Sequence, residues 1–170
     1  MAAGGTDPQP VDHLTGWPAE DKRNEERSLA LKIVIVGNGK VGFSLAEQLV
    51  REKYDVVIVD MREDTLRRAA DALDIMSVKG NGISAATLIE AGVPEADLLV
   101  AATNSDEINM VCCLTAKHLG AKYAIARIRN PEYNTGLSDL KRNMGIDMVI
   151  NPENATACLL YTSPSPRDYA

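Results

Sequence analysis

Residues 32–42 read KIVIVGNGKVG, and this stretch decides the fold. It opens with an apolar run after Lys32, which is typical of a strand buried on both faces of a sheet. The glycine turn of residues 37–42 follows directly, and apolar residues at helical spacing begin at Val41. A G-x-G-x-x-G turn between a strand and a helix predicts a site where backbone N–H groups at the start of the helix hold a pyrophosphate.

The same alternation of strand and helix continues along the chain. Further strands are predicted at residues 55–59, 75–79, 97–102, 123–128 and 148–150, and helices at residues 41–53, 63–73, 83–91, 105–119 and 137–144. Strands that alternate with helices indicate βαβ units, whose right-handed crossovers give a parallel sheet. We therefore expect an α/β fold of the Rossmann type, a doubly wound, six-stranded, mainly parallel sheet with helices on both faces.

Composition narrows the class of protein. The chain has 170 residues, of which 45% are hydrophobic, and a net charge of -6. These values suit one folded domain, and the acidic balance argues against a nucleic-acid partner. The longest apolar run is far shorter than the roughly 20 residues of a membrane helix, which predicts no direct membrane insertion. The cysteines have neither a disulfide nor a metal-ligand pattern, so we expect a reducing cytoplasm and no metal site.

Three segments of different character are predicted. Residues 1–30 contain prolines and glycines that break any regular element, and we expect a flexible leader. Residues 31–160 carry the strand–helix pattern and are expected to form the nucleotide-binding domain. Residues 161–170 read YTSPSPRDYA, which predicts a non-native or disordered tail, with a short recognition segment as the alternative.

An acidic residue, Asp60, ends the second predicted strand. An acidic side chain roughly 20 residues after the glycine turn accepts hydrogen bonds from the hydroxyls of an adenosine ribose and repels a 2′-phosphate. Asp60 therefore predicts NAD(H) in preference to NADP(H), although Arg62 lies close enough to weaken this preference. The alternative is that Asp60 only stabilises the turn at the end of the strand.

Small and polar residues follow the third and fourth predicted strands, at the edge where parallel sheets bind ligands. Gly80 and Asn81 belong to the sequence GNG, which either leaves space beside an adenine or is a plain turn. Thr103 and Asn104 either face the ligand crevice or cap the next helix, a role that Ser105 also fits.

An arginine, Arg127, lies near the end of the fifth predicted strand. A mostly apolar strand rarely contains an arginine without a partner. A ligand phosphate or a carboxylate such as Asp106 is the expected partner.

Catalytic groups are not evident in the sequence. His13 lies in the leader, His118 lies at the end of a helix, and none of the 5 tyrosines has a lysine four residues on. Cys112 and Cys113 are expected in the core or at a subunit contact. We therefore predict a sensor with no catalytic residue and not an enzyme. The alternatives are a fragment of an NAD-dependent dehydrogenase without its substrate domain, and a non-binding domain that serves dimerisation.

Five motifs carry a resemblance to a known family: KIVIVGNGKVG, VVIVD, VKGNG, AATNSDEINMVCCLTAK and IARIRNPEY. In this order they resemble the N-terminal nucleotide-binding domain of Trk-type potassium-uptake regulatory subunits, called the RCK or KTN domain. The likeness runs over residues 32–160, and the segments TNSDEIN and RIRNPEY are more specific than the glycine turn.

This resemblance implies a regulatory protein that is cytoplasmic and peripheral on the inner face of the cell membrane, bound to a potassium transporter subunit. It implies self-association into dimers or rings, and NAD(H) as the ligand, with ATP or ADP as the alternative. Together with the strand-end positions above, the expected nucleotide contacts are Gly37, Asn38, Gly39, Lys40, Val41, Asp60, Gly80, Asn81, Thr103, Asn104 and Arg127.

Overall fold

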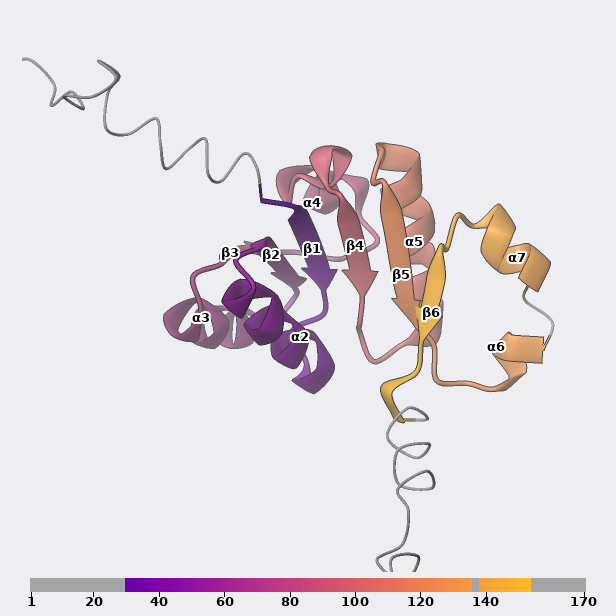
Figure 1. Cartoon of the computed structure of the whole chain (residues 1–170), viewed down its shortest axis with the longest axis horizontal. Helices are drawn as coiled ribbons and strands as arrows, with labels where there is room; N and C mark the ends of the chain where they lie inside the picture. The colour runs from indigo at the N-terminus through magenta and orange to yellow at the C-terminus, as the bar shows by residue number, and fades with distance from the viewer. Residues whose placement is uncertain (1–29, 136–137, 154–170) are drawn as a thin grey trace, which may run out of the picture. The chain divides into compact units, whose positions relative to one another are not determined.

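The structure is a computed structural model that describes residues 30–135 and 138–153 (Figure 1). Most of the expected leader and the whole expected tail lie outside the described residues. The strands are β1 (Lys32–Val36), β2 (Asp55–Asp60), β3 (Met76–Lys79), β4 (Leu98–Ala101), β5 (Tyr123–Arg127) and β6 (Met148–Ile150). Each begins and ends within a few residues of its predicted bounds.

These strands form a 6-stranded sheet in the order β3-β2-β1-β4-β5-β6, and every neighbouring pair is parallel. The doubly wound α/β architecture is therefore confirmed. The chain runs outward from β1 in one direction and returns to start again at β4, so the order reverses between these two strands. In the register, Val36 at the end of β1 pairs with both Val59 and Ala101, which makes the carboxyl ends of β1, β2 and β4 nearly level. A crevice at such a reversal is where parallel sheets bind ligands.

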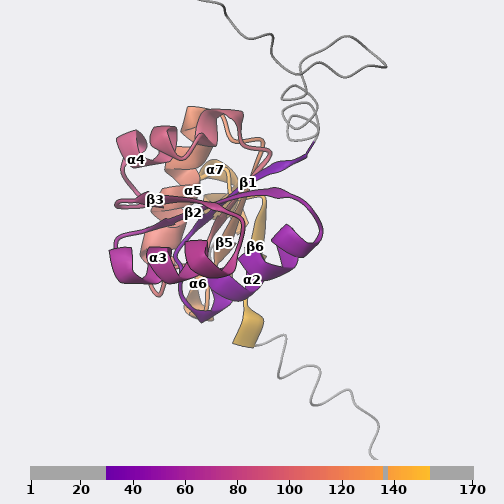
Figure 2. The same ribbon diagram turned by 90° about the vertical axis from the view of Figure 1, so that its left-hand side faces the viewer.

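Helices cover both faces of the sheet, as Figure 2 shows for α3 and α4. The helical elements are α2 (Lys40–Arg51), α3 (Glu63–Ala72), α4 (Ala85–Glu90), the 3-10 turn η1 (Val93–Glu95), α5 (Asp106–Leu119), α6 (Glu132–Thr135) and α7 (Ser138–Asn143). On one face, Ile35 of β1 belongs to a core cluster with Ala46 of α2 and Leu66 of α3. On the other face, Val34 of β1 clusters with Cys112 of α5. The two faces of one buried strand thus hold the two helix layers together.

The cysteine pair on α5 is part of this core. Cys112 and Cys113 are both fully buried, which confirms their predicted place in the core. Burial raises the pKa of the Cys113 thiol to about 12, with the nearby Asp147 carboxylate adding to the shift. A thiol with so high a pKa is protonated at neutral pH and is a poor nucleophile.

Two short helical elements were not predicted. The helix α6 covers only EYNT, too few residues to show an apolar period. The turn η1 follows Gly92, whose φ of 75° ends α4, and contains Pro94. In the described part of the chain, no helix is long and apolar enough to cross a membrane.

Candidate nucleotide-binding site

A cavity of about 310 Å³ lies at the carboxyl ends of β1, β2 and β4. Its volume is at the lower end of the roughly 300–1,000 Å³ range of small-molecule pockets. The lining residues are Val36, Gly37, Gly39, Val59, Asp60, Met61, Arg62, Gly80, Asn81, Gly82, Ala102, Thr103, Asn104 and Ile108. Most of the expected nucleotide contacts line it, whereas Asn38, Lys40, Val41 and Arg127 do not.

The three glycines of the G-x-G-x-x-G turn have three different surroundings. Gly37 has a φ of 102°, and a Cβ there would lie 2.8 Å from the backbone nitrogen of Thr103. A Cβ on Gly42 would lie 1.9 Å from the Gly37 carbonyl oxygen, so α2 can pack this closely on the turn only with glycine. A Cβ on Gly39, by contrast, would have no described atom within 4 Å. Two glycines therefore serve packing, and the third leaves open space beside the cavity.

The amino terminus of α2 is open. Its N-cap is Gly39, which has no side chain to accept a hydrogen bond, and its first turn contains no acidic residue. The first N–H groups of a helix have no partner within the helix, and they carry the positive end of its dipole. Lys40, the first residue of α2, is exposed, and its backbone N–H belongs to this helix end. This end of α2 can therefore accept an anion.

Beside this helix end, Asn38 is buried and turned away from the cavity. Its Nδ2 donates to the carbonyl oxygen of Thr65 at 2.7 Å, which ties the glycine turn to the start of α3. Its backbone N–H donates to Asp60 Oδ2, also at 2.7 Å. Asn38 thus fixes the turn and the acidic side chain relative to each other.

Asp60 makes the contacts expected of a turn-stabilising residue and also lines the cavity. Besides the bond from Asn38, its Oδ1 accepts the backbone N–H of Arg62 at 2.8 Å, so the carboxylate does stabilise the strand-end turn. A carboxylate oxygen can accept more than one hydrogen bond, and Asp60 also lines the cavity. The Arg62 guanidinium lies 3.6 Å from the same carboxylate and is largely exposed. Asp60 is therefore held in a fixed position with acceptor capacity left for ribose hydroxyls.

The turn after β3 is shaped by packing. A Cβ on Gly80 would lie 2.5 Å from the Thr87 side chain, and one on Gly82 would lie 2.2 Å from Val36. Asn81 is exposed, and its Oδ1 accepts the N–H of Ile83 at 3.2 Å. These contacts favour the plain turn among the two predicted roles, although all three turn residues also line the cavity.

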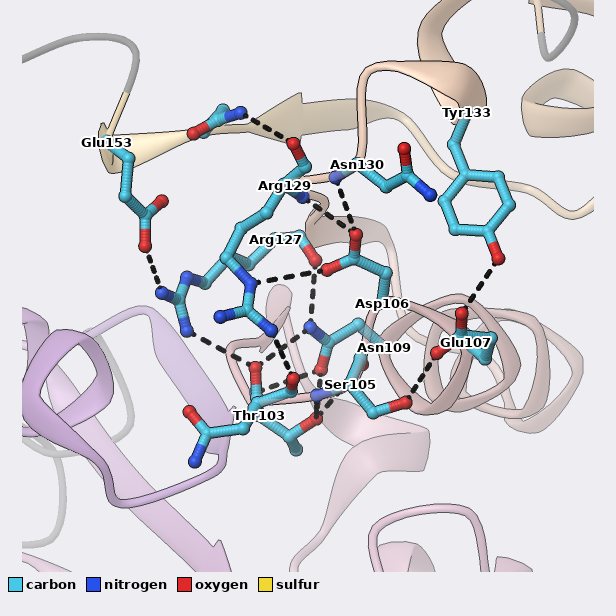
Figure 3. Close-up of polar contacts among 12 residues, drawn as sticks. Thr103, Ser105, Asp106, Glu107, Asn109, Arg127, Arg129, Asn130, Tyr133 and Glu153 are labelled. Atoms are coloured by element: carbon cyan, nitrogen blue, oxygen red, sulfur yellow. Dashed lines mark hydrogen bonds and ion pairs between the residues drawn. The ribbon is translucent and has the colours of Figure 1, made fainter. Parts of the chain in front are cut away.

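The loop after β4 is anchored by a residue that we did not predict, Asn109 of α5 (Figure 3). Its Oδ1 accepts from the backbone nitrogen of Thr103 at 2.9 Å and from the Thr103 hydroxyl at 2.7 Å. Its Nδ2 donates to the carbonyl oxygens of Thr103, at 3.2 Å, and Arg127, at 2.8 Å. This fully buried amide therefore joins the ends of β4 and β5. The N-cap of α5 is Ser105, so Thr103 and Asn104 do not have that role.

Arg127 has a carboxylate partner, as one of the two alternatives predicted, but the carboxylate is not that of Asp106, the example given. Its Nη2 donates to Glu153, which follows β6, and not to Asp106. Asp106 instead accepts the backbone N–H groups of Arg129, at 2.9 Å, and Asn130, at 2.8 Å. The sequence could not show this choice, because Glu153 reaches Arg127 only through the pairing of β6 with β5.

Solved structures of known proteins share this fold. The TrkA-N domain of the inner membrane protein ybaL from Escherichia coli aligns with a TM-score of 0.68 at 17% identity, covering 78% of this chain and 96% of that one. The GsuK channel bound to NAD aligns with a TM-score of 0.61 at 24% identity, covering 71% of this chain and 21% of that one. At these identities the likeness shows the fold alone.

Closer relatives are found among Trk system potassium uptake proteins. A TrkA homolog from Methanothermobacter thermautotrophicus is 37% identical over 125 residues, which cover 74% of this chain and 56% of that protein. TrkA from Azorhizobium caulinodans is 42% identical over 129 residues, covering 72% of this chain and 28% of that protein. This chain thus spans about half or less of the length of these relatives. The TrkA-N domain family matches residues 33–152, most of the sequence, and the chain therefore belongs to this family.

Proposed function

We propose that this chain is a regulatory nucleotide-binding domain of potassium uptake that binds NAD(H) and has no catalytic activity of its own. One observation carries the proposal: the open amino terminus of α2 and the fixed carboxylate of Asp60 border the same cavity. A helix end without a cap binds a phosphate, and an acidic side chain beside it binds a ribose. Together they match the two polar parts of an adenine nucleotide.

In this proposal the pyrophosphate lies on the backbone N–H groups after Gly39, and the adenosine ribose lies on Asp60. The adenine lies toward Gly80 and Asn81. Solved structures of this fold include GsuK bound to NAD, GsuK bound to ADP and a Kef C-terminal domain from Shewanella denitrificans in an AMP-bound form. These three ligands support an adenine nucleotide in general, with ADP or ATP as the alternative to NAD(H).

Regulation would arise from linkage. A nucleotide that binds one conformation of an assembly more tightly shifts the population toward it, by no more than its difference in affinity. The relatives named as Trk system potassium uptake proteins suggest that the assembly contains a potassium transporter subunit and further copies of this chain. Such a domain would lie on the cytoplasmic face of the membrane.

The alternative, a dehydrogenase fragment, has less support from the site. Among the described residues, Asp60 and Arg62 are the titratable ones that line the cavity. They pair with each other at the ribose end, where no proton transfer to a substrate carbonyl is needed. A hydride-transfer enzyme requires an acid or base beside the reacting carbon.

Titration calorimetry of the full chain with NADH, NAD, ADP, ATP and NADPH tests the proposal. We expect NADH and NAD to bind and NADPH to bind less tightly, because Asp60 repels a 2′-phosphate. The substitution Asp60→Asn should weaken NADH binding about tenfold, since the hydroxyls lose a charged acceptor.

Asp97→Asn is the matched control. Asp97 also accepts a backbone N–H, from Lys32 at 2.9 Å, and pairs with a basic side chain, but it precedes β4 and so lies at the opposite edge of the sheet. Equal effects of the two substitutions would remove Asp60 from the site. If none of NADH, NAD, ADP and ATP binds, the proposed function is wrong.

A further inference from the structure

Three methionines in the described part of the chain are more than half exposed: Met61 at 67%, Met76 at 58% and Met148 at 56%. Their accessibility is therefore similar, but their positions differ. Met76 and Met148 begin β3 and β6, the two outer strands of the sheet, and so lie away from the carboxyl ends of the strands (Figure 1). Met61 directly follows β2 and lines the cavity. An exposed thioether thus borders the proposed nucleotide site.

The backbone on both sides of Met61 is held in place. Asp60 Oδ1 accepts the backbone N–H of Arg62 at 2.8 Å, which closes the turn around Met61. The carbonyl oxygen of Arg62 in turn accepts the Thr65 hydroxyl at 2.9 Å, at the start of α3. Met61 is therefore fixed between the end of β2 and the start of α3, so its side chain stays beside the cavity and open to solvent.

Oxidation of Met61 would change the polarity of the cavity wall. A peroxide converts the apolar thioether of methionine into a polar sulfoxide. The thioether sulfur makes favourable contacts with aromatic rings, whereas the sulfoxide oxygen is a strong hydrogen-bond acceptor. In the proposed binding mode the adenine lies toward Gly80 and Asn81, which line the same cavity as Met61. A sulfoxide would therefore remove an apolar contact with the base and add an acceptor close to the Asp60 carboxylate.

The cysteines of α5 do not offer a competing target. Cys112 and Cys113 are both fully buried, and burial raises the pKa of both thiols. Buried, protonated thiols react poorly with oxidants. Among the described residues, Met61 is the sulfur-containing side chain that lines the cavity.

We propose that Met61 is an oxidation site through which peroxides lower the affinity of this domain for nucleotide. One oxygen atom of hydrogen peroxide is transferred to the Met61 sulfur and the other leaves in water, so the sulfur is oxidised and the peroxide reduced. Methionine sulfoxide reductases reverse this step, which makes the change a reversible one. The inference rests on the proposed function and adds an oxidant as an input to the same site.

Treatment of the full chain with hydrogen peroxide, followed by removal of the peroxide and calorimetry with NADH, tests this inference. Peptide mass mapping locates each added oxygen, and a thermal melt checks that the oxidised protein stays folded. Oxidised wild type should bind NADH at least about fivefold more weakly than untreated wild type, because the cavity wall has become polar. Sulfoxide reductases should restore the affinity.

Two leucine variants separate Met61 from the other exposed methionines, each compared with its own untreated form. Met61→Leu should keep its NADH affinity within about twofold after peroxide, since leucine carries no sulfur to oxidise. Met148→Leu is the matched control and should lose as much affinity as the wild type does, because it retains Met61.

Three results would overturn the inference while nucleotide binding itself stands. The first is a sulfoxide at Met61 with unchanged NADH affinity, and the second is an equal loss of affinity in Met61→Leu and in the wild type. The third is a Met61 that stays unoxidised while Met76 and Met148 are oxidised. If the untreated wild type binds none of NADH, NAD, ADP and ATP, the proposed function is wrong and this inference with it.

Discussion

Two helices start at the same edge of the sheet, and their amino termini are built in opposite ways. At the start of α5, Ser105 caps the helix by accepting from the N–H of Ile108 at 3.2 Å, and Asp106 and Glu107 supply negative charge. Each of these acidic side chains is itself engaged. The Tyr133 hydroxyl donates to Glu107 at 2.7 Å, for example, and lowers the pKa of that carboxyl. At the start of α2 there is neither a side-chain cap nor an acidic residue.

This difference shows that the position of a helix end does not by itself make an anion site. Both helices follow central strands that border the crevice, so their backbone N–H groups are placed similarly. At α5 the side chains of the protein already satisfy that end, and the loop is braced against β5. At α2 the same capacity remains available to a ligand. The residue types in the first helical turn decide between these outcomes.

The largest effect is expected from breaking the brace at the start of α5, that is, the Asn109 hydrogen bonds that join the ends of β4 and β5. Asn109→Ala removes the partner of the Thr103 N–H and of two carbonyl oxygens, those of Thr103 and Arg127. Leaving buried backbone groups unpaired costs about 1–3 kcal/mol each, so we expect a loss of about 4 kcal/mol in the free energy of unfolding. Urea denaturation measures it. Asn81→Ala, at an exposed position, should cost less than about 1 kcal/mol. Similar losses for the two variants would contradict the proposed brace.

A smaller difference in stability is expected between alanine substitutions at Gly37 and at Gly39. Gly37→Ala should destabilise the protein by about 2 kcal/mol, because a φ of 102° and contact with the Thr103 backbone both oppose a Cβ. Gly39→Ala should change stability by less than about 0.5 kcal/mol, since its φ of -83° suits any residue and the space around it is open. Thermal melts of both variants measure this difference.

Although Gly39→Ala should keep its stability, it should bind nucleotide less tightly. A methyl group on Gly39 projects into the space where the proposed pyrophosphate approaches the backbone, so NADH affinity should fall at least tenfold. Calorimetry measures this loss, with Glu90→Ala, at the exposed carboxyl end of α4, as the control. Wild-type affinity in Gly39→Ala would mean that the open space does not hold the ligand.

The two helix ends also differ in how far the sequence predicts them. The strand–helix pattern predicts the sheet, and the glycine turn predicts the α2 end, because these features depend on neighbouring residues. The brace at the α5 end depends on contacts between distant segments. The role of Asn109 could have been predicted from its position. It shares helical spacing with Cys113 and Ala116, which are buried, and a polar residue on a buried helix face requires hydrogen-bond partners. Glu153 has no comparable signal, since only the pairing of β6 with β5 brings it to Arg127.

The smallest effect is expected from adding an acidic residue to the amino terminus of α2, which has none. Lys40→Glu places a carboxylate in the first turn of α2, where it interacts favourably with the helix dipole and should raise stability by about 0.5 kcal/mol. The same change should lower NADH affinity about fivefold, because the carboxylate repels the pyrophosphate. Lys40→Gln, which removes the positive charge without adding a negative one, separates the two causes. If both variants bind NADH equally, the effect comes from the lysine charge alone. If only Lys40→Glu gains stability and loses affinity, both changes arise from the N–H groups that α5 closes with its own side chains.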